Sequence, residues 1–238
     1  MKTKSKALLL TLCAVLLVAA SVLGTMAYLT STDTVTNTFT VGKVEIKLDE
    51  TDVTNPNGPR VQANSYKLMP GTTYTKDPTV TVKAGSEESY VRMKVTFNNA
   101  TQIIALCTDP DMADEVTGVE NAFPLIRMVN FVEANAAKWD GIIPDNMVET
   151  EDMLADEYYF DAANDTLTYY FYYKDPVKAP NGDVVLPVLF DSITVPEWVT
   201  GEQLNALNNF QITVVAEAIQ AGSFANAGAA WAAFAPQP

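Results

Sequence analysis

The chain has 238 residues, of which 48% are hydrophobic and 10% aromatic, so it is long enough and apolar enough for one domain with its own core. Its 29 Asp and Glu residues against 15 Lys and Arg residues give a formal net charge of −14, and such a surface repels nucleic acid and anionic membranes. Histidine is absent, which excludes every catalytic triad and metal site that depends on imidazole.

Residues 1–27 predict a signal peptide. Met1–Lys6 is basic, Ala7–Gly24 is an uncharged apolar run, and small residues precede a cleavage position after Ala27. We therefore expect secretion of a mature chain that begins at Tyr28. Because the apolar run just reaches bilayer length, membrane contact is expected only through an uncleaved signal. Cleavage removes three of the 15 basic residues and no acidic one, so the remaining 12 against 29 acidic residues give −17.

Residues 28–41 predict an extended segment. From Tyr28 to Gly42 the sequence alternates with period two, with threonines on one face and Val35, Phe39 and Val41 on the other. This apolar face is too thin to hold the segment in place alone. We therefore expect the segment to join a sheet.

The body of the chain, residues 42–238, contains several segments with the alternation or β-branched composition of strands. They are Lys43–Asp49, Thr79–Lys83, Tyr90–Asn98, Thr166–Lys174, Val184–Asp191, Ser192–Val195 and Phe210–Ala218. The separating segments include the turns Asp52–Pro59 and Pro180–Asp183 and a connecting loop over Ala84–Ser89. This pattern predicts an all-β fold, an antiparallel jelly-roll β-sandwich in one domain.

Residues 99–157 lack this alternation and predict a partly helical insertion between sheet strands. Within it, Met128–Trp139 predicts a short helix. Beyond it, Gly201–Leu207 predicts one or two helical turns, and the tail Gly228–Pro238 predicts a frayed terminus.

The residues that could act as nucleophiles, ligand contacts or metal ligands are better explained by structural roles. Cys107 is the one cysteine outside the signal, and we expect it to be a small buried residue, since a nucleophile needs a base and no histidine is present. The aromatic runs Tyr158–Phe160 and Tyr169–Tyr173 favour core packing over a sugar-binding platform. Acidic side chains favour solvated loops over a calcium site. They are Asp109, Asp111, Asp114, Glu115, Glu149, Glu151, Asp152, Asp156 and Glu157.

Three blocks of the chain follow one another in a recognisable order. The first joins Gly24–Tyr28, Phe39–Gly42 and Lys43–Leu48; the second joins Leu68–Gly71, Lys76–Val82 and Tyr90–Val95; the third joins Leu189–Pro196, Ile212–Ala221 and Ala230–Trp231. In this order they resemble the TasA/camelysin family of secreted Gram-positive proteins, whose members are processed by a dedicated signal peptidase. Residues 99–157 carry none of the resemblance.

The resemblance implies a jelly-roll subunit of extracellular biofilm-matrix fibres, located in the matrix or at the cell surface. In such fibres the mature amino-terminal segment of one subunit inserts as a strand into the next. The donor here would be residues 28–41, beginning at Tyr28, with Leu29, Val35 and Phe39 as inward anchors; the alternative is an ordinary first strand that pairs within its own subunit. The implied partners are further copies of the chain in a head-to-tail polymer, related matrix subunits, and the signal peptidase during export.

Two other functions stay open. A cell-surface adhesin or ligand-binding module could use the same sandwich. A camelysin-like metalloprotease is disfavoured, because zinc proteases hold their metal with histidines and this chain has none. We expect no enzyme activity, no cofactor, no metal and no catalytic residue.

Overall fold

The structure, a computed structural model, describes residues 6, 8, 10–18, 42–108, 120–141, 158–207 and 209–234. It divides into two units, Met1–Val41 and Gly42–Pro238. In the first unit residues 10–18 are helical, and no helix within the described ranges is long and apolar enough to cross a membrane. The predictions for cleavage between Ala27 and Tyr28, and for the donor residues Leu29, Val35 and Phe39, lie outside the described residues.

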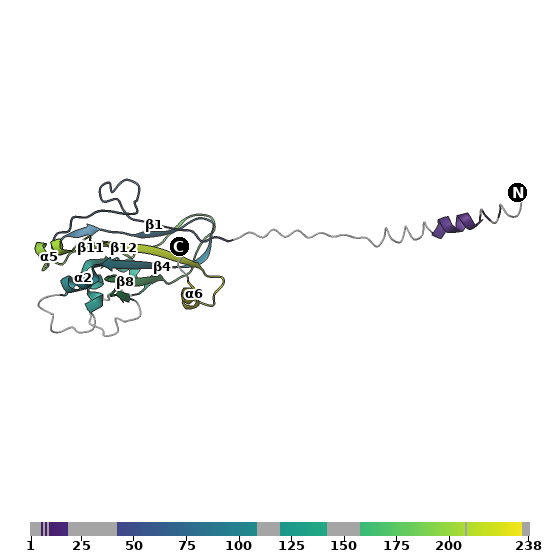
Figure 1. Ribbon diagram of the computed structural model, residues 1–238. Helices are drawn as coiled ribbons and strands as arrows, with labels where there is room; N and C mark the ends of the chain where they lie inside the picture. The colour runs from purple at the N-terminus through teal and green to yellow at the C-terminus, as the bar shows by residue number, and fades with distance from the viewer. Residues whose placement is uncertain are drawn as a thin grey trace. The chain divides into compact units, whose positions relative to one another are not determined.

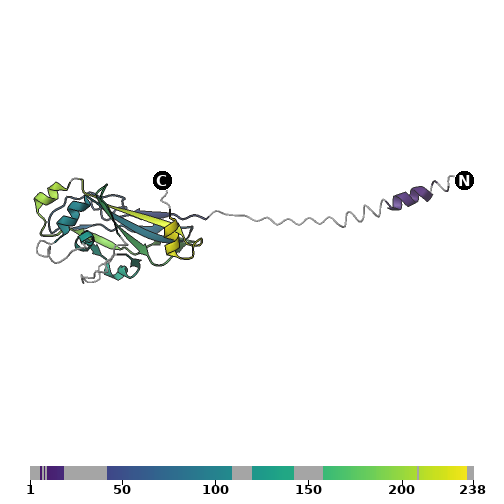
Figure 2. The same ribbon diagram turned by 60° about the horizontal axis from the view of Figure 1, so that its bottom comes forward.

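The second unit is mostly β-structure with short helices (Figure 1). Its strands are β1 (Ile46–Asp49), β2 (Thr73–Thr75), β3 (Thr79–Val82), β4 (Ser86–Asn98), β5 (Val129–Phe131), β6 (Trp139–Asp140), β7 (Tyr158–Asp161), β8 (Thr166–Tyr173), β9 (Val177–Ala179), β10 (Val184–Val185), β11 (Phe190–Thr194) and β12 (Ile212–Gln220). Its helices are α2 (Ala100–Cys107), the 3-10 helix η1 (Glu120–Ala122), α3 (Phe123–Met128), α4 (Glu133–Ala136), α5 (Gly201–Ala206) and α6 (Ala227–Ala233). Helices α2 and α5 lie toward one end of the sheets and α6 toward the other (Figure 1, Figure 2).

The named strands form three sheets with antiparallel pairing throughout, as the alternation predicted. The largest has the order β12-β4-β8-β6, with β7 pairing β8 and β9 pairing β4. The other two have the orders β1-β3-β10 and β2-β11-β5. Strands β1 and β12 are therefore edge strands of their sheets.

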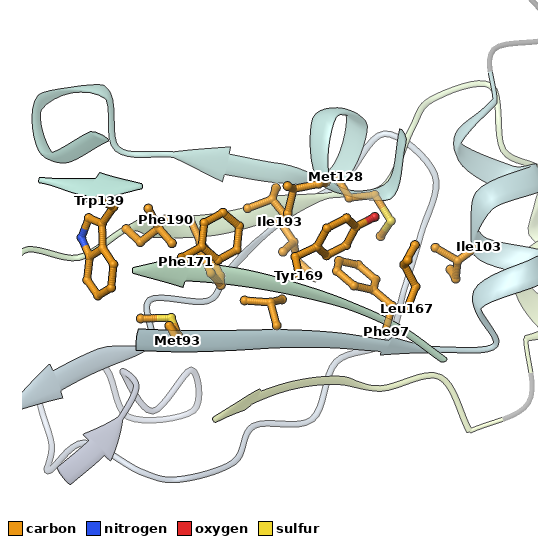
Figure 3. Close-up of a cluster of buried hydrophobic side chains, with 14 of the residues drawn as sticks. Met93, Phe97, Ile103, Met128, Trp139, Leu167, Tyr169, Phe171, Phe190 and Ile193 are labelled. Atoms are coloured by element: carbon orange, nitrogen blue, oxygen red, sulfur yellow. The ribbon is translucent and has the colours of Figure 1, made fainter. Parts of the chain in front are cut away.

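The core is built from the alternation of the central strands. In β4 the buried side chains are Val91, Met93, Val95 and Phe97, while the intervening residues face the other side. Buried residues of β8, β11 and α2 join the same cluster (Figure 3). The clustered residues shown there include Leu167, Tyr169, Phe171, Phe190, Ile193 and Ile103. The aromatic run in β8 thus supplies core residues, as expected, whereas the same expectation is wrong for Tyr159 and Phe160 of β7, which are exposed.

The described parts of residues 99–157 belong to this core. The expectation of a short helix over Met128–Trp139 holds only for Glu133–Ala136, which forms α4; strands β5 and β6 take the flanking parts. Val129 and Phe131 pair with β11, and Trp139 is buried beside Tyr173 of β8. Long-range pairing overrides the helix-forming composition of this stretch.

Two other local expectations are corrected. Ser86 and Ser89, expected in a loop, already belong to β4, because both pair with β9 across an irregularity in register. The tail is not frayed over residues 228–234, because Asn226 caps α6 by accepting a hydrogen bond from the Ala229 N–H at 2.9 Å. Helix α5 matches the expected turns at Gly201–Leu207.

Candidate functional site

A groove of about 800 Å³ runs between β1 and β12, which lie side by side (Figure 1). Half-buried apolar side chains of both strands line it. From β1 they are Ile46 and Leu48, and from β12 they are Ile212, Val214 and Ala216. Leu68, Ile193 and Phe210 line it as well. Polar side chains such as Gln62, Asn64 and Lys76 line it as well, so the groove combines apolar side chains at the edge of the core with polar ones.

The edge of β12 presents backbone groups to this groove. The Asn98 N–H donates to the Gln211 carbonyl at 3.2 Å, and the Ala221 N–H donates to the Glu88 carbonyl at 2.8 Å, so odd-numbered residues of β12 hydrogen-bond to β4. Hydrogen bonding alternates along an antiparallel pair. Even-numbered residues from Ile212 onward therefore direct their N–H and C=O groups away from β4.

The edge of β1 has the same arrangement. The Lys83 N–H donates to the Glu45 carbonyl at 2.9 Å, so odd-numbered residues of β1 face β3. Ile46 and Leu48 accordingly direct their backbone groups away from β3. In the described part of the chain no strand pairs with the free edge of β1 or of β12. Two open edges and an apolar floor are the features that accept an added strand.

A polar network closes the groove where β1 ends. Glu50 exchanges two backbone hydrogen bonds of 2.8 Å with Val61, which occupies the strand edge at this point. The Glu50 carboxylate also accepts from Lys76 Nζ at 2.9 Å and from Asn64 Nδ2 at 3.0 Å. The loop that follows β1 is thereby fixed to the segment between β2 and β3.

Arg60 organises the neighbouring part of this loop. Its guanidinium donates to Asp49 at 2.7 Å and to Asp77 at 2.9 Å, and also to the Thr79 hydroxyl at 2.7 Å. Burial opposes ionisation of Asp49 and of Asp77. Hydrogen bonds outweigh this effect and lower the pKa of both carboxyls: Lys47 and Arg60 donate to Asp49, and Thr51 and Arg60 donate to Asp77.

Among the described residues, the other candidates for a functional role have a structural explanation. Cys107 is fully buried, and desolvation raises the pKa of its thiol to about 12, which keeps it protonated as expected of a core residue. Within the described residues, no group of three or more His, Cys, Asp or Glu side chains is placed to hold a metal ion. The acidic residues from Asp109 to Glu115 and from Glu149 to Glu157 lie outside the described ranges.

Comparison with family models, curated proteins and solved structures gives no match to this chain. The predicted donor residues are not described, and the structure adds the groove and its closing network instead. The sequence contained one indication of these features: the block Lys76–Val82 combines a charged pair with the start of a strand. Asn64 and Arg60 stand in an irregular loop without a recognisable pattern.

Proposed function

We propose that the chain is a secreted structural subunit in which residues 28–41 of one copy occupy the β1–β12 groove of the next. The observation that supports this most directly is the presence of two free strand edges beside one groove that carries apolar side chains from both strands. An incoming strand would hydrogen-bond to the even-numbered residues of β12 or β1 and place alternate side chains on the floor. A head-to-tail contact of this kind does not close on itself, so repetition gives a fibre.

The chemistry of the two partners is complementary. Residues 28–41 have high strand propensity and a thin apolar face that includes Val35 and Phe39. The groove supplies the missing apolar surface through residues such as Leu48, Val214 and Ala216. Insertion would cover the apolar face of the segment and the half-buried side chains of the groove together.

The same proposal includes a jelly-roll β-sandwich for the fold and export to the extracellular matrix. The three antiparallel sheets around one core support a jelly-roll sandwich. Cleavage after Ala27 would free Tyr28 as the first residue of the donor after export. The ordered sequence blocks shared with the TasA/camelysin family support a place in the biofilm matrix.

The decisive experiment compares the mature chain beginning at Tyr28 with a variant lacking residues 28–38. We expect fibres by electron microscopy from the first and monomers from the second. A synthetic peptide of residues 28–41 should bind the truncated protein, whereas the same peptide with Val35→Asp and Phe39→Asp should not. Fibres of unchanged yield after truncation would contradict the proposal.

A ligand-binding module is the second candidate, and exposed aromatic side chains favour it. Tyr159 and Phe160 on β7 are 60% and 36% exposed, unlike the core aromatics of β8. Aromatic rings at a surface can stack on sugars. A mature chain that remains monomeric and binds glycans, with binding lost in Tyr159→Ala, would support this module over the fibre subunit.

A further inference from the structure

Three side chains at the closed end of the groove form a compact cluster: Lys76, Glu50 and Asn64. One oxygen of the Glu50 carboxylate accepts from Lys76 Nζ at 2.9 Å, and the other accepts from Asn64 Nδ2 at 3.0 Å. Lys76 is 8% exposed and Glu50 6% exposed, so this ion pair is largely removed from water. An amine and a primary amide are thus held by the two oxygens of one buried carboxylate.

Burial of this pair is not explained by stability alone. Taking two charges out of water costs free energy that their attraction repays only in part, and apolar residues of similar volume often serve as well. A desolvated lysine beside a base is also the arrangement that activates an amine as a nucleophile. The electrophile would be a carbonyl carbon beside the amine, and the Asn64 amide, which is held by the other oxygen of the same carboxylate, provides one.

We propose that Lys76 and Asn64 form an intramolecular amide cross-link, with Glu50 transferring the protons. Each oxygen of the Glu50 carboxylate has a separate task in this reaction. The oxygen beside Nζ accepts a proton from the lysine, and the oxygen beside Nδ2 returns a proton to the leaving nitrogen.

The reaction needs no oxidant, reductant or co-reactant. Glu50 takes one proton from the Lys76 ammonium, and the neutral amine attacks Cγ of Asn64, so that the Nζ–Cγ bond forms. The Cγ–Nδ2 bond then breaks as Nζ loses a second proton, and the nitrogen departs as ammonia. It carries away the proton left on Glu50, so the products are a secondary amide, an ionised Glu50 and ammonium.

The surroundings of Asn64 suit this chemistry. Its carbonyl oxygen accepts from the Val53 N–H at 3.0 Å, and that donor would stabilise the negative charge that develops on the oxygen during attack. Its Nδ2 also donates to the Thr51 carbonyl at 2.8 Å, which fixes the orientation of the amide. The chain therefore positions the electrophile through backbone groups that cannot move independently of the loop.

Tyr66 forms an aromatic wall beside the cluster and packs edge-on against Tyr74. Its hydroxyl donates to the Thr75 carbonyl at 2.7 Å, next to Lys76 in the chain. Burial, together with the negative charge of Glu50, raises the pKa of Tyr66 to about 12. Tyr66 and the burial of Lys76 and Glu50 thus keep most water away from the ion pair.

The cross-link would join the loop after β1 covalently to the segment between β2 and β3. It would hold the closed end of the groove by a bond that reducing agents do not break. Its formation requires only the three side chains of the cluster and does not depend on fibre formation.

Mass spectrometry of the purified full chain or mature chain tests the proposal. We expect an intact mass lower than the sequence mass by one ammonia. Trypsin should fail to cut after Lys76 and should give Val61–Lys67 joined to Leu68–Lys83. The variants Lys76→Arg and Asn64→Ala should show the full sequence mass, whereas Lys67→Arg, which alters an exposed lysine of the same loop, should retain the loss.

Two results would overturn the cross-link. One is a wild-type mass equal to the sequence mass, with Val61–Lys67 and Leu68–Lys76 recovered as separate peptides. The other is a gain in mass at Asn64, which would show simple deamidation. Lys76→Arg keeps the charge and can still bond to Glu50, so its mass can be read on a folded protein.

Discussion

The guanidinium carbon of Arg92 lies 4.5 Å from the ring centre of Trp231, and this contact joins helix α6 to the outer face of the largest sheet. Phe234 lies 5.0 Å from the same carbon, and Tyr170 of β8 lies 5.2 Å from it. The Arg92 side chain is only 14% exposed, so its attraction to the rings acts with little screening by water.

Replacement of Trp231 should therefore loosen the C-terminal helix. We expect Trp231→Ala to lower the free energy of unfolding by about 1–3 kcal/mol, since a desolvated cation–π contact and apolar burial are lost together. Trp231→Phe, which retains a ring, should lose less. Urea unfolding of protein lacking residues 28–38 measures this, and equal stability of wild type and Trp231→Ala would contradict it.

Glu217 is the anionic partner of the same arginine. It accepts from Arg92 Nε at 2.6 Å and from Lys94 Nζ at 2.7 Å, and its side chain is 9% exposed. Glu217→Gln would leave both cations without a countercharge, so we expect a loss of about 2–3 kcal/mol in the free energy of unfolding. The control Glu88→Gln alters an exposed carboxylate of β4, the strand that carries Arg92 and Lys94, and should stay within about 0.5 kcal/mol of wild type.

Stability should fall in acid because of the Arg60 network. The pKa of Asp49 and that of Asp77 are both lower in the folded chain than in the unfolded one. A lowered carboxyl pKa gives stability that is fully present above the unfolded value of about 3.9 and is lost as the pH falls through the folded value. Urea midpoints at neutral pH and below pH ~4 measure this loss. Arg60→Gln should be less stable than wild type at neutral pH and should lose less stability on acidification. Equal losses of stability in the two proteins would show that Arg60 does not lower the pKa of these carboxyls.

Cys107 should behave as an inert thiol. Its burial and raised pKa predict that an alkylating reagent will not label it in the folded mature chain, and that labelling becomes rapid in denaturant. Labelling at the same rate in both conditions, followed by mass spectrometry, would show that the thiol is accessible.

The strands that could be predicted from the sequence are those in which apolar and polar residues alternate and the apolar residues are the buried ones. Tyr90–Asn98 and Phe210–Ala218 were predicted close to β4 and β12, because one face of each strand carries the apolar side chains. Strand β5 was missed because its three residues are held by pairing with β11, which only the folded chain supplies.

The groove could not be predicted for a related reason. Ile46 and Val214 each occupy an alternating strand that would look the same at the centre of a sheet. Whether their backbone groups are free depends on which strands pair, and that is a property of the whole topology. The cluster of Glu50, Asn64 and Lys76 likewise joins residues from three separate segments of the chain.

Val214 and Val215 are neighbours on β12 that face opposite sides, and they give a matched test of the groove. Both residues border the groove, but Val214 is half-buried on its apolar side, whereas the side chain of Val215 is 39% exposed. An aspartate at the first position would place an unpaired charge against an inserted strand, while one at the second would stay in water. We expect Val214→Asp to prevent fibres and Val215→Asp to form them normally.

Both variants should be assayed for folding by circular dichroism and for fibres by electron microscopy and sedimentation. Ala216→Phe offers a second route, since it fills the groove floor with an apolar ring and adds no charge. A folded, monomeric Ala216→Phe variant would show that occupancy of the groove, rather than damage to the core, controls assembly. Wild-type fibre yield from both Val214→Asp and Ala216→Phe would place the subunit contact elsewhere on the molecule.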